Sequence, residues 1–432
     1  METNKETLII EILKDQVRPA LGCTEPGAVA LAAARAKELL GAPVERAEIS
    51  VDKNVLKNGL GVGIPGTKER GNAFAAALAL ICGRSEYGLE VLRDVNEVAI
   101  AEAEALLSDG RVKMEYNAES SCLQVCAKVS GCGHSAEVII YKQHANIAFE
   151  ARDGVVLRNE MDISSGSDAA AITAAPSLQQ QIKQFSIHEM IELAQTLPAE
   201  ELAFMQDGID MNMRMALAGI SDNLGVGIGR YMMSRANSTV EGRAKAYTAA
   251  ASEARMSGWP LSVMSSAGSG NHGLTAIIPI AVFGQEYGLD CATIHRAVAF
   301  SHMITIFVKS YLGALSPICG CGVAAGVGCA AGLTLLRGGS EHQIEASILN
   351  MIAGLTGMLC DGAKLGCAYK LAVAVDAAID ASNMALARVH IPGDNGILSE
   401  SAEQSIINMA MVSSKGMAAT DSVIVEIMQE KC

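Results

Sequence analysis

A long segment without charged residues constrains the fold of this 432-residue chain more than any other feature. No Asp, Glu, Lys or Arg occurs between Lys309 and Arg337, and a stretch of that length could cross a lipid bilayer. Pro317, several glycines and clustered cysteines nevertheless interrupt its sequence, SYLGALSPICGCGVAAGVGCAAGLTLL, and such residues break a continuous helix. We therefore expect a helix, a loop and a second helix buried inside a soluble protein, and no interaction with a membrane.

The composition favours tightly packed helices and argues against nucleic acid as a partner. Hydrophobic residues make up 50% of the chain but aromatic residues only 4%, so small aliphatic side chains must form most helix contacts. The formal net charge is −14, and an acidic protein is repelled by nucleic acid and by anionic lipid. The opening sequence, METNKETLIIEILKDQV, is acidic and amphipathic, which is typical of neither a signal peptide nor a transit peptide. We expect a cytoplasmic protein.

The hydrophobic pattern predicts an α+β fold with two domains. Residues 1–185 mix helical spacing with strand-like alternation, and consecutive strand-like segments between residues 111 and 154 predict a half-buried antiparallel sheet. A linker rich in Ser, Asp, Ala and Pro follows over residues 163–177, and residues 186–432 are almost entirely helical in pattern. The expected helices span 5–17, 26–40, 72–83, 95–107, 186–196, 199–217, 240–256, 291–312, 340–358, 367–385 and 403–413, and a further strand spans 44–51.

Two cysteine groups in the helical half predict a metal centre. The chain has 12 cysteines, which should be mostly reduced in the cytoplasm, where clustered cysteines more often serve metal binding or catalysis than disulfides. SPICGCGVAAGVGC contains Cys319, Cys321 and Cys329, and MLCDGAKLGC contains Cys360 and Cys367. Thiolates at glycine-rich breaks are typical of iron–sulfur clusters. Buried packing is the alternative, and zinc is disfavoured because the paired C-x₂-C spacing is missing.

A glycine- and serine-rich segment before a helix predicts a carboxylate site. In SVMSSAGSGNHGLTAIIPIAVFG, residues 262–284, hydroxyl groups and backbone N–H groups converge at the positive end of a helix. The alternative is an ordinary capping loop, and the segment matches neither the P-loop nor the dinucleotide pattern. The candidate substrate-binding residues are Ser265, Ser266, Ser269, Asn271 and His272.

A cysteine precedes the helix predicted near the N-terminus. In RPALGCTEPGAVALAAARA, Cys23, Thr24 and Glu25 come directly before Pro26, a residue favoured in the first turn of a helix. Thr24 or Glu25 could simply cap the helix. A thiol at a helix N-terminus should also have a lowered pKa, so a functional Cys23 is equally consistent with the pattern. We place Cys23 and Glu25 in the catalytic group.

Two further segments carry weaker signals. DKNVLKNGLGVGIPGT, residues 52–67, offers Asn54 and Lys57 as candidate ligands for an amino-acid carboxylate, although a plain loop explains it as well. The chain ends at Cys432, which carries both a thiol and a free α-carboxylate and so resembles cysteine itself. A frayed tail of no function is the alternative.

The whole chain resembles the L-cysteine desulfidase family through GCTEPGAVA, KNVLKNG, SSAGSGNHG, SPICGCGVAAG and MLCDGAKLGC. Its helical half is similar to the related iron–sulfur L-serine dehydratase alpha chains. This resemblance implies a [4Fe–4S] cluster without pyridoxal phosphate, held by Cys360, Cys367 and Cys321 (or Cys319). It also implies Cys23 as the base, the 262–272 loop with Asn54 or Lys57 as the substrate site, and Cys432 as a possible autoinhibitory ligand.

The resemblance implies elimination of sulfide from L-cysteine, with pyruvate and ammonia as the other products. The alternatives are an L-serine or other hydroxy-amino-acid dehydratase that uses the same cluster, or a non-catalytic protein that senses amino acids or iron–sulfur status. The partner we expect is therefore a small amino acid. The small-residue apolar helices also favour a homodimer.

Overall fold

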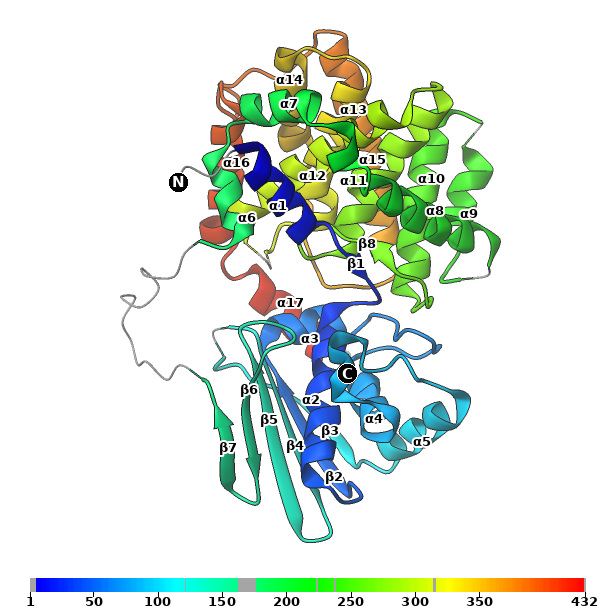
Figure 1. Ribbon diagram of the computed structural model, residues 1–432, viewed down its shortest axis with the longest axis vertical. Helices are drawn as coiled ribbons and strands as arrows, with labels where there is room; N and C mark the ends of the chain where they lie inside the picture. The colour runs from blue at the N-terminus through cyan, green and yellow to red at the C-terminus, as the bar shows by residue number, and fades with distance from the viewer. Residues whose placement is uncertain are drawn as a thin grey trace.

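The computed structural model describes residues 5–120, 122–161, 176–222, 224–236, 238–313 and 316–430. It contains a large helical body and a smaller body built around a sheet, which confirms the expected α+β class (Figure 1). Most of the expected linker and the terminal Cys432 lie outside the described residues.

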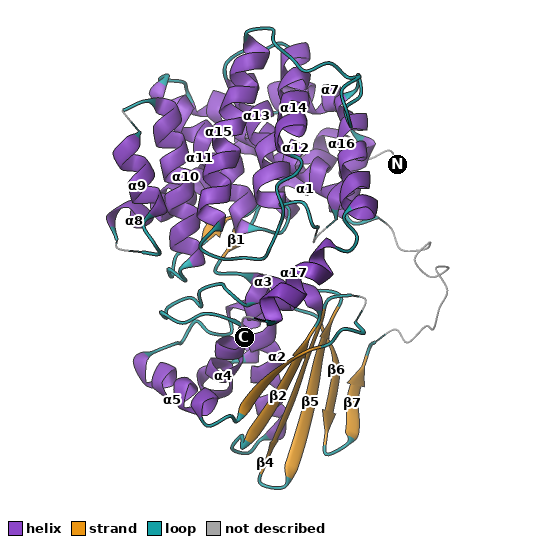
Figure 2. Ribbon diagram, turned by 180° about the vertical axis from the view of Figure 1, so that it is seen from behind, coloured by secondary structure: helices purple, strands orange, loops and turns teal. Residues whose placement is uncertain are grey.

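The smaller body is a layer of helices packed on one face of a six-stranded sheet (Figure 2). Its core joins apolar residues of α2, α4 and α5 to those of β2, β4 and β5. The elements of this part of the chain are α2 (Thr24–Leu40), β2 (Arg46–Val51), α3 (Lys53–Gly59), α4 (Asn72–Cys82), α5 (Glu97–Ser108), β3 (Val112–Tyr116), β4 (Gln124–Gly131), β5 (His134–Tyr141), β6 (Ile147–Arg152) and β7 (Val155–Asn159).

The sheet is mixed, and in this it departs from the prediction. The strand order is β3-β2-β4-β5-β6-β7, and every neighbouring pair is antiparallel except β2 and β3, which are parallel. The connection from β2 to β3 runs through α3, α4 and α5, and a helical crossover of this kind returns the chain in the same direction. Alternation within each strand does not reveal this, because both pairings have the same side-chain period.

The helical body surrounds a core formed by α11, α12, α13 and α15. Helix α12 is long and apolar enough to cross a membrane, but 78% of its most apolar 18-residue stretch is buried inside the protein. The elements of this body are α6 (Leu178–Gln181), α7 (Ile187–Thr196), α8 (Met205–Ser221), α9 (Ile228–Arg235), α10 (Val240–Met256), α11 (Gly270–Glu286), α12 (Cys291–Leu312), α13 (Ala325–Leu336), α14 (Glu341–Leu355), α15 (Cys367–Leu386) and α16 (Ala402–Met411).

Each end of the chain packs on the body to which its neighbouring sequence does not belong: the N-terminal helix packs on the helical body, and the C-terminal helix packs on the smaller body. Helix α1 (Lys5–Gln16) places Ile9 and Ile12 in the core of the helical body, whereas α17 (Thr420–Gln429) packs on α3 and contributes Val425 to the core of the smaller body (Figure 1). The division expected at residues 185 and 186 therefore does not describe the two ends of the chain.

A two-stranded ribbon also joins the bodies. Strand β1 (Pro19–Ala20) pairs antiparallel with β8 (Val263–Met264), which lies between α10 and α11. The ribbon sets the start of α2, and hence Cys23, beside the glycine- and serine-rich segment of the helical body.

Candidate active site

One cavity of about 830 Å³ is lined by residues of both bodies. Most of the residues singled out in the sequence line it: Cys23, Glu25, Lys57, Ser269, Asn271, His272, Cys319, Cys321, Cys360 and Cys367. Segments more than 340 residues apart along the chain therefore meet in one site, as Cys23 and Cys367 do.

A short antiparallel bridge brings the two cysteine segments together. Ile318 pairs with Leu359, the Cys319 N–H donates to the Met358 carbonyl at 2.8 Å, and the Cys360 N–H donates to the Pro317 carbonyl at 2.7 Å. The chain then turns through residues 361–366 and enters α15 at Cys367. The backbone itself thus fixes the relative positions of the thiol-bearing segments.

Two glycines in these segments permit close approach to neighbouring groups. A side chain at Gly320, the first residue of a π-helical turn over Gly320–Ala324, would come within 2.5 Å of His272 Nε2. Gly362 has a φ of +89°, and a Cβ there would lie 2.0 Å from the Lys57 carbonyl oxygen. The turn between Cys360 and Cys367 therefore contains a left-handed glycine that contacts the smaller body.

The four thiols of the two cysteine segments are close enough to influence one another. A hydrogen bond with the Cys321 thiol lowers the pKa of Cys319, and the same bond together with burial raises the pKa of Cys321. Burial raises the pKa of Cys360, and raises that of Cys367 to about 12. No three His, Cys, Asp or Glu side chains in the described ranges converge on a point where one metal ion could bind.

A strained turn precedes α11. Ser266 and Ser269 form a two-residue hairpin with backbone hydrogen bonds of 3.1 Å in both directions, and Ala267 between them has a φ of +46°. A left-handed alanine is unfavourable and persists only where its surroundings hold it. His302 Nδ1 lies 2.8 Å from Ser266 Oγ, and His272 Nδ1 lies 2.9 Å from the Ser266 carbonyl oxygen, so two buried imidazoles hold this turn.

Three of the expected substrate ligands do not line the cavity. Ser265 donates its hydroxyl to the Arg18 carbonyl at 2.6 Å, which ties the turn to the segment before α2. Ser266 is fully buried against His302. Asn54 lies in the first turn of α3, where its N–H is capped by Asp52, and its side-chain oxygen is buried away from the cavity. The helical period of α3 instead directs Lys57 and Asn58 to the cavity.

Cys23 is the N-cap of α2 and its side chain makes no capping hydrogen bond. Burial raises the pKa of its thiol, and the charge of Arg255 and a hydrogen bond with that guanidinium act in the opposite direction. The lowered pKa expected at a helix N-terminus is therefore wrong for the protein without ligands, because removal of the thiolate from water outweighs the helix end.

Hydrogen bonds and an ion pair hold the polar groups of the smaller body. Asn58 Nδ2 donates to Glu25 Oε1 at 3.1 Å, and Thr24 Oγ1 donates to Glu25 Oε2 at 3.2 Å. Lys57 Nζ lies 2.6 Å from Asp421 Oδ1 of α17, and it also donates to the Cys360 carbonyl at 3.4 Å. Lys57 is thus engaged in a buried ion pair rather than presented to a ligand.

The sequence reasoning missed Arg255 and Lys309, which are both buried and line the cavity. Burial lowers the pKa of Lys309, and the nearby thiols of Cys321, Cys360 and Cys319 act against this shift. The signal that could have identified Lys309 is a cation within an otherwise apolar helical stretch, MITIFVKSYL, whereas Arg255 follows Glu253 in AAASEARM and has no such signal.

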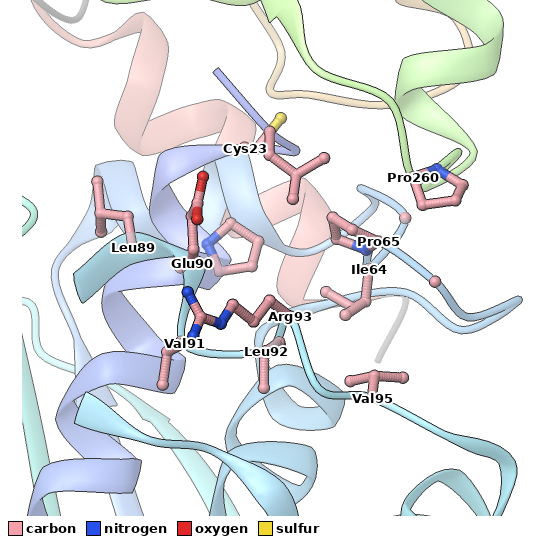
Figure 3. A pocket seen from close by; sticks show the side chains of 15 residues that line it. Cys23, Ile64, Pro65, Leu89, Glu90, Val91, Leu92, Arg93, Val95 and Pro260 are labelled. Carbon is pink, nitrogen blue, oxygen red and sulfur yellow. The ribbon is translucent and has the colours of Figure 1, made fainter. Parts of the chain in front are cut away.

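A second, mostly apolar cavity of about 320 Å³ adjoins Cys23 (Figure 3). Ile64, Leu92 and Val95 are among its lining residues, and the Cys23 sulfur points away from Leu92 and Val95 (Figure 3). Cys23 therefore lies in the wall between the two cavities.

Comparison with known proteins identifies the family of the chain. The serine dehydratase alpha chain family matches residues 86–426. The chain is 50% identical over 428 residues to a UPF0597 protein of Caldanaerobacter subterraneus subsp. tengcongensis, an alignment that covers 99% of both chains. It is 47% identical over 429 residues to a UPF0597 protein of Clostridium tetani, with 99% of this chain and 100% of that protein covered. The predicted relation to the serine dehydratases is confirmed, whereas the relatives' names state no activity.

Proposed function

The chain belongs to the serine dehydratase alpha chain family, and from that premise we propose that it is a lyase that removes sulfide from L-cysteine without pyridoxal phosphate. Loss of the Cα proton and of the β-thiol leaves aminoacrylate, which tautomerises and hydrolyses to pyruvate and ammonia. The observation that carries the proposal is the convergence of four cysteines, Cys23 and the N-terminus of α11 on one cavity.

The cysteines fit an iron–sulfur cluster better than a single metal ion. A cluster takes its thiolates on different irons, so its ligands need not converge on one point. We propose Cys360, Cys367 and Cys321 as ligands, with Cys319 as the alternative to Cys321. When bound, a cluster with one open iron supplies a Lewis acid for the leaving sulfur.

The remaining roles belong to side chains and backbone of the two bodies. We propose that Cys23 removes the Cα proton, and that the hairpin turn and the first N–H groups of α11 bind the substrate carboxylate. Ser269 makes no side-chain cap for α11, and its hydroxyl lies 3.7 Å from the Cys321 sulfur instead, so the helix end is left to a ligand. This arrangement would hold the substrate between the base and the cysteines.

The family name also supports elimination of water from L-serine, and one experiment separates the two reactions. The protein is purified anaerobically, iron and acid-labile sulfide are measured, and kcat/KM is determined for sulfide release from L-cysteine and pyruvate formation from L-serine. We expect the L-cysteine value to be the larger. A larger L-serine value would make the protein a dehydratase, and an iron–sulfur protein inactive on both would favour a sensor.

The cytoplasmic location and the homodimer stay predictions, and gel filtration tests the latter.

A further inference from the structure

Two buried groups of opposite charge lie near Cys23 in the wall of the large cavity. Arg255 and Glu25 are 6% and 8% exposed, and both line the large cavity. Arg255 Nη2 donates to the carbonyl of Gly22, the residue before Cys23, and Glu25 follows Cys23 by two residues, so both charged groups lie close to the thiol. They come from different bodies, Arg255 from α10 and Glu25 from α2.

Among the described residues, Glu25 is the cavity-lining carboxylate with no lysine or arginine within ion-pair distance. Its hydrogen bonds come from the neutral groups of Asn58 and Thr24, and His144 Nε2 lies 3.9 Å from Oε1. Asp361, the other carboxylate among the described lining residues, is already neutralised by two lysines. A buried carboxylate bonded to neutral donors attracts a cation.

Arg255 is a buried cation that has no carboxylate partner among the described residues. Its Nη1 donates to Asn271 Oδ1 at 3.1 Å and its Nη2 donates to the Gly22 carbonyl, and in the described part of the chain no carboxylate lies within ion-pair distance. Its Nε is buried without a hydrogen-bond partner and faces Gly270, the first residue of α11. A guanidinium without a counter-ion beside an uncapped helix N-terminus is a site for an anion.

We propose that Glu25 and Arg255 form a zwitterion clamp, in which Glu25 binds the α-ammonium of the substrate and Arg255, with the N-terminus of α11, attracts its α-carboxylate. The Cα–H is then presented to Cys23, which lies near both charged groups. The clamp rests on the proposed function and deepens it, since it makes the α-amino-acid head, rather than the β-substituent, the feature that all ligands must share. Simple carboxylic acids and simple amines satisfy only one half of it.

Ligands without a leaving group test the clamp separately from catalysis. L-Alanine carries both charges, propionate lacks the ammonium and ethylamine lacks the carboxylate. Each is titrated into the anaerobically purified full-length protein, and its affinity is taken from the concentration that protects Cys23 from iodoacetamide, with the Cys23 peptide quantified by mass spectrometry. None of the three contains a thiol that would consume the reagent.

The wild-type protein is expected to bind L-alanine at least about 10-fold more tightly than propionate or ethylamine, because each loses one charge-assisted interaction. Glu25→Gln is expected to weaken L-alanine and ethylamine about 30-fold and to change propionate little. Arg255→Gln is expected to weaken L-alanine and propionate similarly while ethylamine changes little. Glu25→Asp and Arg255→Lys, which keep the charges, should recover part of the affinity.

Arg18→Gln is the matched control, because Arg18 lines the same cavity but pairs with Asp15 outside the clamp. It should leave the order of the three affinities unchanged. Equal weakening of all three ligands in Glu25→Gln, or no weakening in either variant, would overturn the clamp. If Arg255→Gln does not fold, as judged by circular dichroism, Arg255→Lys takes its place, with a smaller loss expected for the same two ligands.

The two proposals can fail independently. A protein that shows this selectivity but releases neither sulfide from L-cysteine nor pyruvate from L-serine keeps the clamp and loses the lyase function. A protein that eliminates sulfide while propionate protects Cys23 as well as L-alanine keeps the lyase function and loses the clamp.

Discussion

The two walls of the large cavity are built by different means. The helical wall consists of residues 269–272, 319–321 and 360–367, which lie at the ends of long buried helices and are joined by backbone hydrogen bonds. The mixed wall consists of residues 23–25, 57 and 58, at the start of α2 and on α3. Apart from the β1–β8 ribbon before α2, the side chain of Lys57 ties this wall to Cys360 and to Asp421 of α17. Rigid backbone suits the placement of metal ligands, whereas side-chain links allow the facing wall to belong to a separate body.

This comparison separates the residues on which cofactor binding depends from those on which catalysis and the attachment of the two bodies depend. A change in the helical wall should affect cofactor content first, because that wall carries the four cysteines. A change in the mixed wall should affect catalysis or the attachment of the two bodies and leave the cofactor in place. The following changes test that separation, from the largest expected effect to the smallest.

Cys360→Ser is expected to abolish both iron content and activity, because a serine hydroxyl is a poor replacement for a thiolate ligand. Iron and acid-labile sulfide measured after anaerobic purification check this. Cys329→Ala is the matched control, since Cys329 is fully buried in α13 but does not line the cavity. Normal iron content in Cys360→Ser would remove Cys360 from the ligand set, and the same measurement on Cys319→Ser and Cys321→Ser decides between these two.

Cys23→Ser is expected to lower kcat by about 10³-fold, within the range for loss of a general base, and to leave iron content unchanged. The measurement is sulfide release from L-cysteine at saturating substrate, with iron determined on the same sample. Loss of iron in this variant would make Cys23 a ligand and would show that the two walls share the cofactor.

Lys57→Met is expected to lower the free energy of unfolding by about 3 kcal/mol, because it leaves the carboxylate of Asp421 unpaired in a buried site. The double variant with Asp421→Leu should recover a large part of that loss, since it removes both charges. Lys14→Met breaks an exposed ion pair with Glu201 and should cost less than about 1 kcal/mol. Urea unfolding measures all three, and an equal cost for Lys57→Met and Lys14→Met would show that the link between α3 and α17 contributes little.

His302, which holds the turn before α11, makes the stability of the protein sensitive to acid. Burial lowers its pKa to about 3, so the unfolded chain, in which the pKa is near 6.5, binds the proton first as the pH falls. Stability is therefore present above pH 6.5 and is lost below it, by about 2 kcal/mol at pH 5 from this one group. His302→Asn should reduce the difference between the urea midpoints at pH 7 and pH 5, and an unchanged difference would assign the acid sensitivity elsewhere.

Ala267→Gly is expected to change stability least, by about 0.5 kcal/mol in the stabilising direction, because relief of the left-handed conformation slightly exceeds the added entropy of the unfolded chain. Ala267→Val should instead destabilise the turn, since a β-branched residue tolerates a positive φ poorly. Thermal unfolding of the two variants measures the sign, and destabilisation by glycine would show that the Ala267 side chain matters more than the strain.

The sequence predicted most elements of both bodies because each has a local period. Helix α12 coincides with the helix expected over residues 291–312, and β4, β5 and β6 fall within the expected strands. Strand β7 was missed, since Val155, Val156 and Leu157 are consecutive apolar residues that show no alternation and are all exposed at the sheet edge.

In the candidate site, the sequence predicted the residues that are recognisable by type but missed those whose role depends on helix packing. Cysteines and a glycine-rich turn indicate their chemistry by residue type, so the four cysteines of the helical wall were named in advance together with Ser269, Asn271 and His272. Lys309 and Lys370, which line the same cavity, were not. Arg255 and the ion pair of Lys57 with Asp421 depend on which helices meet, and a charged residue in a helix is usually exposed to water. Asn54 and Lys57 were both named as ligands, although Asn54 of α3 does not line the cavity and Lys57 pairs with Asp421 of α17.

By itself, the sequence determined the local elements, the cysteine segments and the family resemblance, because these depend on residue type and on spacing over a few turns. Only the tertiary structure decided that β2 and β3 are parallel, that α1 and α17 pack on opposite bodies, and that Arg255 reaches the cavity wall beside Cys23 and Glu25. These features join residues tens to hundreds of positions apart, and burial and charge pairing at such separations are set by packing rather than by any local pattern.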